Sequence, residues 1–421
     1  MIEIFNCIYI ILFCGVLFRF KYNDVIIEKC FKGTNFSLVE KYSINILILL
    51  LLLLFCSFFN FNNTIFLYSL FFLSILSLLI MKRNILVFKL KNYQNFILIF
   101  FFTLVISINL VVNLKLEWDG HFWYLKALNF YENLSFFNLE NTPNNHYPHL
   151  GGIVWGTFWK ISLLNYEFFG RIIYIFIYVI SILCIVEKIS DNLNIKLLFS
   201  ILLFFLTFDH FLFSGYQAYL LFCLIIIICN LLGKFNLKKL NYFQIIFIIL
   251  SSYLLSWIKN EGTFYFLFIT LFVVYFQTNN KKLFILFLFC FLILLRILLM
   301  NKISDHSLLG NTININLIFN DFFYKILLIS KHIIIAMFKY PIWILILLSI
   351  FLKKLDKNEF YIIYLTILSI LFVYFIYLNT DIKKLDWHLS GSIDRILFHL
   401  SGFYMLFLSY RLKYFCKNFI K

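Results

Sequence analysis

Residues 43–59 read SINILILLLLLLFCSFF and contain no charged side chain. A helix of about 17 to 25 apolar residues is long enough to cross the hydrocarbon core of a bilayer. Similar runs recur along the whole chain, and they are too long and too many for the core helices of a soluble domain. The sequence therefore predicts an all-α, polytopic membrane protein.

The composition supports this class. The chain has 421 residues, of which 63% are hydrophobic and only 13% are charged, whereas soluble domains carry about 25% charged residues. The net charge of +16 favours cytoplasmic loops that face anionic lipid over nucleic-acid binding. The nine cysteines are scattered without a CxxC pair, so they indicate neither a disulfide framework nor a zinc site.

The apolar runs predict about thirteen transmembrane helices. They are expected near 4–19, 43–59, 64–81, 95–113, 171–187, 196–208, 217–233, 242–257, 263–277, 283–300, 339–352, 360–378 and 396–412. The apolar segment 150–164 is short and contains glycines, which favours an interfacial or re-entrant helix over a span.

Five segments follow from these spans. We expect N-terminal transmembrane helices at 1–113, a loop with interfacial helices at 114–170, a central transmembrane bundle at 171–300, a second loop segment at 301–338, and C-terminal transmembrane helices at 339–421.

Basic residues cluster between spans at 82–91, 234–239, 281–282 and 353–357, and in the C-terminal tail. Placing these clusters in the cytoplasm puts both loop segments, with their amphipathic helices, on the outer face.

The loop 117–150 holds most of the other polar side chains. Glu117 and Asp119 point the same way if this segment is extended. If a helix begins near Asp119, then Asp119 is a plausible N-cap and shares one face with Trp123, Lys126 and Phe130. A carboxylate, an indole and an ammonium group together suit a sugar. The alternative is an interfacial amphipathic helix with a capping aspartate.

Two further polar stretches are predicted to lie on the outer face. His146-Tyr147-Pro148-His149-Leu150 ends the loop, and tryptophans follow it as in an aromatic belt. Lys259-Asn260-Glu261-Gly262 separates two apolar runs. This second stretch is either a tight turn held by a local ion pair or part of a polar cavity, because a charge near the bilayer centre costs about 2.5 to 3.5 kcal/mol.

The last polar stretch is WHLSGSIDR at 387–395. In a helix, His388, Ser392, Arg395 and His399 lie on one face. Arginine suits a phosphate because its guanidinium forms two parallel hydrogen bonds. The alternative is an arginine that reaches from a membrane helix to the interface.

The order WDGHFWYLKA (118–127), HYPHL, KNEG and WHLSGSIDRILFHL (387–400) resembles the C-type polytopic glycosyltransferases. Within these, it is most similar to the group of protein mannosyltransferases and lipid A aminoarabinose transferases. The resemblance implies an enzyme of the bacterial inner membrane that moves a hexose or pentose from a polyprenyl-phosphate donor. The acceptor is then a glycan, lipid or protein of the cell envelope, and the active site faces outward.

The resemblance also implies roles for individual residues. Asp119 matches the catalytic acidic position, and Glu117 either orients the acceptor or shares a divalent metal, Mg²⁺ or Mn²⁺, with Asp119. The donor phosphate is expected at Arg395, Lys259 and His388. Substrate contacts are expected at Lys126, Trp123, His146, Tyr147, Glu261 and Ser392.

Two other functions stay open. A transporter or flippase for a lipid-linked or anionic substrate would carry ionisable residues at mid-membrane depth and broken spans in matching halves. A non-catalytic scaffold would tolerate alanine at Asp119 and Arg395. The chain has no GxGxxG motif or Walker loop, so any activated substrate is expected to arrive through the membrane.

Overall fold

The computed structural model describes residues 2–19, 31, 34–80, 90–112, 116, 118–208, 214–304, 315–352 and 361–419. Helices make up 83% of the structure and no strand occurs among the described residues, which confirms the all-α prediction. The chain forms two compact units. The first contains residues 1–184 and 210–305, and the second contains residues 185–209 and 306–421.

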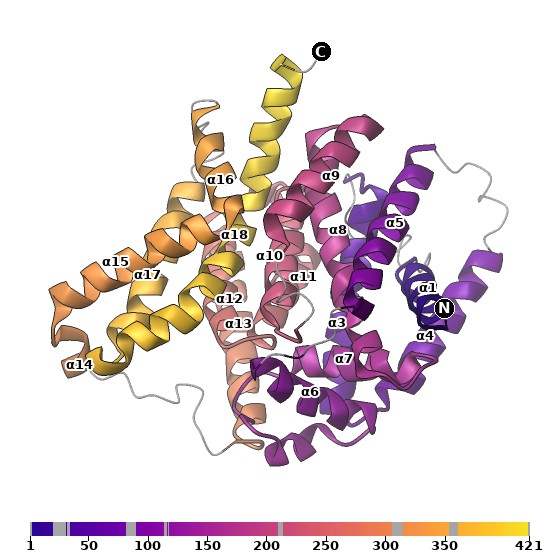
Figure 1. The fold of residues 1–421 in the computed structure, drawn as a ribbon, viewed down its shortest axis with the longest axis horizontal. Coiled ribbons are helices and arrows are strands. Elements are labelled where there is room, and N and C mark those ends of the chain that lie inside the picture. Colours follow the sequence, from indigo (N-terminus) through magenta and orange to yellow (C-terminus); the bar gives the residue numbers. More distant parts are fainter. Residues whose placement is uncertain are drawn as a thin grey trace. The chain divides into compact units, whose positions relative to one another are not determined.

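The first unit contains most of the helices (Figure 1). They are α1 (Ile2–Leu17), α3 (Leu38–Phe58), α4 (Asn63–Ile80), α5 (Leu90–Val112), α6 (Trp118–Tyr131), η2 (Phe136–Asn141), α7 (Leu150–Ile161), η3 (Glu167–Arg171), most of α8 (Ile172–Ile189), α10 (Ala218–Leu232), η5 (Leu237–Lys239), α11 (Tyr242–Ser256), α12 (Glu261–Tyr275) and α13 (Asn279–Met300). Every residue of α10 is buried. In contrast, only 22% of the apolar part of α13 is buried, and several of its large apolar side chains are exposed.

Local sequence explains where several of these helices begin. Ser37 caps α3, and its side chain accepts a hydrogen bond from the Glu40 backbone while Glu40 bonds back to the Ser37 N–H. Asn241 and Gln244 form the same reciprocal pair at the start of α11. Both are capping boxes, which satisfy backbone donors that a helix leaves unpaired.

The second unit contains α9 (Leu193–Thr207), α14 (Ile315–Phe319), α15 (Phe322–Lys339), α16 (Pro341–Phe351), α17 (Tyr361–Leu378) and α18 (Ile382–Phe419). A bend of 91° separates α15 from α16. Its cause is Pro341, which begins α16 and keeps Tyr340 in an extended conformation.

Each of the thirteen predicted spans falls on a helix. In the described residues, however, only three helices are long and apolar enough to cross a membrane, or four if α15 and α16 form one bent span. These three are α3, the η3–α8 segment at Glu167–Ile189, and α13. The count of thirteen spans and the orientation therefore stay predictions.

Three predicted segments can be compared with the helices of the structure. The segment 301–338, expected as an outer-face segment with amphipathic helices, contains all but the last residue of the helix α15, and its place on the outer face stays a prediction. The polar stretch 387–395 continues directly into the last predicted span, because α18 runs without interruption from Ile382 to Phe419. The helix α7 is buried along its length except at Lys160. That burial contradicts the interfacial alternative, which would expose one face, whereas the re-entrant alternative stays a prediction.

Candidate functional site

The site is built on the close packing of α6 against α7 (Figure 1). Gly152 and Gly156 lie one helical turn apart on α7 and face α6. A Cβ atom at Gly156 would lie 2.1 Å from the carbonyl oxygen of Ala127, and one at Gly152 would lie 2.8 Å from Lys126 Cβ. Only glycine fits at this distance between the two backbones.

The first turn of α6 is held in a similar way. A Cβ atom at Gly120 would lie 2.0 Å from the carbonyl oxygen of Ser214, so this turn packs directly on the Ser214–Gly215 segment. Asp119 lies in this first turn, because α6 begins at Trp118 and not at Gly120, where an N-cap at Asp119 would require it to begin. Glu117 and the side chain of Asp119 lie outside the described residues, so their catalytic roles and a shared Mg²⁺ or Mn²⁺ stay predictions.

Lys126 connects α6 to the loop that follows it. Its Nζ atom donates hydrogen bonds of 2.9 Å to the carbonyl oxygens of Asn144 and Tyr147, and it lies 5.0 Å from the centre of the Trp123 ring. The side chain is only 1% exposed, and this burial lowers the pKa of Lys126 well below its usual value. Lys126 therefore fixes the loop that carries His146 and Tyr147.

The predicted face of α6 is confirmed from Trp123 onward. Trp123, Lys126 and Phe130 are all buried, and the Trp123 and Tyr147 rings meet edge to face with centroids 6.4 Å apart. Tyr147 stays 39% exposed, so its ring can contact both the protein and a ligand. Three of the predicted substrate residues, Trp123, Lys126 and Tyr147, thus lie together.

The loop also contacts Trp257, two residues before the KNEG turn. The backbone N–H of Leu150 donates to the carbonyl oxygen of Trp257 at 2.8 Å, although the two residues are far apart in the sequence. Lys259 and Glu261 form an ion pair of 3.9 Å in this turn. A Cβ atom at Gly262 would lie 1.9 Å from the Leu255 carbonyl oxygen. These contacts confirm a tight turn that requires glycine and carries a local ion pair.

Arg296 is a polar residue of this region that the sequence analysis missed. It is 2% exposed on α13. It donates to Asn260 Oδ1 at 3.0 Å and to Thr263 Oγ1, and its guanidinium carbon lies 5.9 Å from the centre of the Trp257 ring. Among the described residues, neither Arg296 nor Lys126 has a carboxylate partner. A single arginine within a 22-residue apolar helix was the available signal.

His149 lies beside these two cations. It is completely buried at the N-cap of α7, and neither ring nitrogen has a hydrogen-bond partner of good geometry among the described residues. Burial lowers its pKa well below the usual value, and the nearby charges of Lys126 and Arg296 lower it further, against a smaller opposite effect of the Asn145 backbone. His149 is therefore neutral at pH 7.

Acidification should destabilise the protein through His149. The folded state binds fewer protons than the unfolded state below about pH 6.5, so stability falls as the pH drops from there toward the folded pKa, by up to about 1.4 kcal/mol per pH unit. Thermal unfolding in detergent at pH 7.5 and pH 5.5 measures this loss. The loss of stability between the two pH values should be smaller in His149→Phe. It should be unchanged in His121→Gln, which replaces an exposed ring. An unchanged loss in His149→Phe would contradict the assignment.

We name the group Trp123, Lys126, Tyr147, His149, Trp257 and Arg296 the first-unit cluster. It combines aromatic faces with two buried cations, an environment that suits a sugar next to an anionic group. Lys259 and Glu261 lie in the adjoining turn, and His146 packs against Tyr147 with ring centroids 4.7 Å apart. The described residues contain no group of three His, Cys, Asp or Glu side chains arranged to hold a metal ion.

The other predicted site residues lie on α18 in the second unit. The helical spacing of His388, Ser392, Arg395 and His399 is confirmed. Ser392 Oγ donates to the His388 carbonyl oxygen at 2.6 Å, and an Arg395 Nη2 atom donates to the Gly391 carbonyl oxygen at 2.8 Å. Because these residues and the first-unit cluster belong to different units, a shared site stays a prediction.

A second group of polar residues lies next to α7, and the sequence analysis missed it as well. Arg171 is 1% exposed and binds Glu167 Oε1 at 2.8 Å. The Tyr174 hydroxyl donates to the Gly151 carbonyl oxygen at 2.6 Å, and the Gln217 amide reaches the same hydroxyl at 3.3 Å. The Tyr174 hydroxyl thus fixes the N-terminal end of α7.

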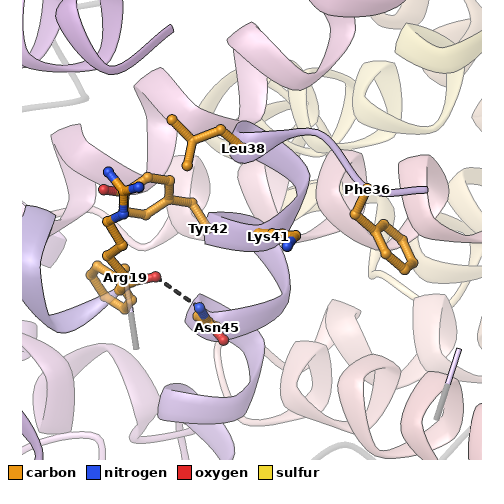
Figure 2. Close-up of a pocket in the computed structure, with 7 residues that line it drawn as sticks. Arg19, Phe36, Leu38, Lys41, Tyr42 and Asn45 are labelled. Atoms are coloured by element: carbon orange, nitrogen blue, oxygen red, sulfur yellow. Dashed lines mark hydrogen bonds between the residues drawn. The ribbon is translucent and has the colours of Figure 1, made fainter. Parts of the chain in front are cut away.

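A separate pocket of about 130 Å³ lies between the C-terminal end of α1 and the N-terminal end of α3 (Figure 2). Arg19, Lys41, Tyr42 and Asn45 provide its polar lining. Asn45 donates to the Phe18 carbonyl oxygen at 2.7 Å, which ties the two helices together at the pocket wall. None of the predicted site residues lines this pocket.

The comparisons with known proteins give no further identification. No family model, curated protein or solved structure matches the chain. The function is therefore inferred from the residues of this chain and from the resemblance of its motifs.

Proposed function

We propose that this protein is a membrane glycosyltransferase that moves a sugar from a polyprenyl-phosphate donor to a cell-envelope acceptor. The observation that carries the proposal is the hydrogen bond between Leu150 and Trp257. It joins the HYPHL motif to Trp257, two residues before the KNEG turn and beside the buried Arg296. The motif at 118–127 holds the same loop through Lys126.

The proposed reaction needs a general base and residues that stabilise the leaving phosphate. Asp119 acts as general base and takes the proton from an acceptor hydroxyl. The hydroxyl oxygen forms a bond to the anomeric carbon as the bond from that carbon to the phosphate oxygen breaks. The electron pair leaves with the polyprenyl phosphate, whose charge Arg395, Lys259 and His388 stabilise. Attack from the face opposite the leaving group inverts the anomeric centre.

The remaining residues bind and orient the substrates. Trp123, Tyr147 and His146 offer ring faces and polar edges to a sugar, and Glu261 and Ser392 offer hydrogen-bond partners. Lys126 acts as a positioning residue, because its ammonium already binds two loop carbonyl oxygens. Glu117 orients the acceptor.

A transfer assay tests the proposal. Purified protein in liposomes receives radiolabelled hexose or pentose on a polyprenyl phosphate, together with an envelope extract of the source cells as acceptor. We expect label to move from the lipid to the envelope fraction, with release of polyprenyl phosphate. Intact donor that instead moves between the leaflets would favour the flippase, and unchanged donor with every sugar would contradict both functions.

A further inference from the structure

The helix α15 of the second unit has one exposed side that is mostly apolar and also carries Lys331, one turn after Leu327. Phe323, Leu327, Ile334 and Phe338 recur at helical spacing and are 81%, 69%, 57% and 71% exposed. The opposite side, which includes Ile329 and Ala336, is buried where α15 packs against α17 and α18. An exposed apolar side of this size marks contact with a membrane or a partner.

The polar residues of α15 argue against a helix that crosses the bilayer. Lys331 and His332 lie in the middle of the helix, where a crossing helix would place them in hydrocarbon. His332 Nε2 lies 2.9 Å from Asp386 Oδ1, and the Asp386 side chain is 76% exposed. A carboxylate with this exposure needs water or the polar headgroup region around it.

The neighbouring part of α18 fixes the depth of α15. His332 pairs with Asp386 and Lys339 pairs with Asp394, so both helices advance in the same direction along this contact. Residues 382–395 of α18 are too polar for hydrocarbon. They include Lys383, Lys384, Asp386, His388, Asp394 and Arg395. Because the His332–Asp386 hydrogen bond and the Lys339–Asp394 ion pair hold α15 along this segment, α15 lies at the same depth.

The bend at Pro341 sets the direction of α16 relative to α15. After the 91° turn, the apolar helix α16 follows the apolar part of α18, where the Trp343 and Tyr404 rings lie 5.3 Å apart. Figure 1 shows α15 beside the first part of α18 and α16 beside its last part. If α15 lies along the membrane surface, then this bend directs α16 into the bilayer.

We propose that α15 and residues 382–395 of α18 lie in the membrane interface, with the apolar side of α15 against the acyl chains of the lipid. The pair α15–α16 is then a surface helix followed by an entering helix, and not a broken span. Interfacial helices bury an apolar side about 5 to 10 Å into the boundary between headgroups and acyl chains.

Spin labels in liposomes of the full-length protein test the depth of α15. The nine native cysteines are first replaced by serine. Single cysteines are then introduced by Phe323→Cys, Leu327→Cys, Ile334→Cys and Phe338→Cys, and the accessibility of each label to oxygen and to a nickel chelate gives its depth. We expect four shallow depths within about 5 Å of each other. A crossing helix would spread them over about 22 Å, at 1.5 Å per residue.

The helix α13 offers a matched control. Leu283→Cys, Phe287→Cys, Leu294→Cys and Leu298→Cys repeat the same spacing on exposed positions of a helix long enough to cross. These labels should show the 22 Å spread. A similar spread on α15 would overturn the proposal, and so would labels as accessible as in water or labels shielded from both reagents by protein.

Discussion

Asp119→Asn should reduce sugar transfer by about two to four orders of magnitude, the contribution of a positioned general base. Asparagine keeps the size and shape of the side chain, but it cannot take a proton from the acceptor hydroxyl. Because Asp119 lies in the first turn of α6, the substitution also removes a favourable charge at a helix N-terminus, an effect of about 0.3 to 1 kcal/mol. Transfer should therefore fail while the protein still folds.

The matched control is Glu132→Gln, which changes an exposed carboxylate just beyond the other end of α6. It should keep the wild-type rate. Gel filtration and thermal unfolding of both variants show whether they fold. Full activity of Asp119→Asn would remove this residue from the mechanism, and inactivity of Glu132→Gln would show that the loss is not specific to Asp119.

Gly156→Ala should strongly destabilise the protein. Its new methyl group would lie 2.1 Å from the Ala127 carbonyl oxygen and 2.9 Å from Phe130 Cβ. The first of these is backbone in the middle of α6 and cannot move without separating the helices. We expect a loss of about 1 to 3 kcal/mol, the usual cost of overpacking, measured by unfolding in detergent.

Gly391→Ala makes the same change where no atom lies within 4 Å of the new Cβ. Gly391 is inside α18, and replacing glycine by alanine within a helix stabilises by about 0.5 to 1 kcal/mol. The two variants should therefore shift stability in opposite directions. Equal shifts would mean that α6 and α7 are not packed through Gly156.

The helices could be predicted because their signal lies in continuous apolar runs, such as 43–59 and 283–300. The inward face of α6 could be predicted for a similar reason, since Trp123, Lys126 and Phe130 repeat at helical spacing. Both signals are local. The bounds of α15 could not be predicted, because Lys325, Lys331, His332 and Lys339 interrupt its apolar pattern.

The contacts of the site could not be predicted from such patterns. The hydrogen bond from Leu150 to Trp257 joins backbone atoms of distant segments. Because the same backbone atoms occur at almost every residue, the sequence does not indicate which of them pair. In the sequence, Arg296 is a charged residue within an apolar run. The sequence does not indicate that Asn260 and Thr263 are its hydrogen-bond partners. The roles of Asp119, Arg395 and the other proposed substrate residues stay predictions for the experiments above.

The two contacts of Lys126 affect how the site can move. Lys126 lies two helical turns after Asp119 on α6 and binds the carbonyl oxygens of Asn144 and Tyr147. A helix of this length moves as a rigid rod, so a displacement at one end is transmitted to the other. Asp119, the proposed base, and the loop that carries Tyr147 should therefore move together. A substrate that shifts one of them should also shift the other.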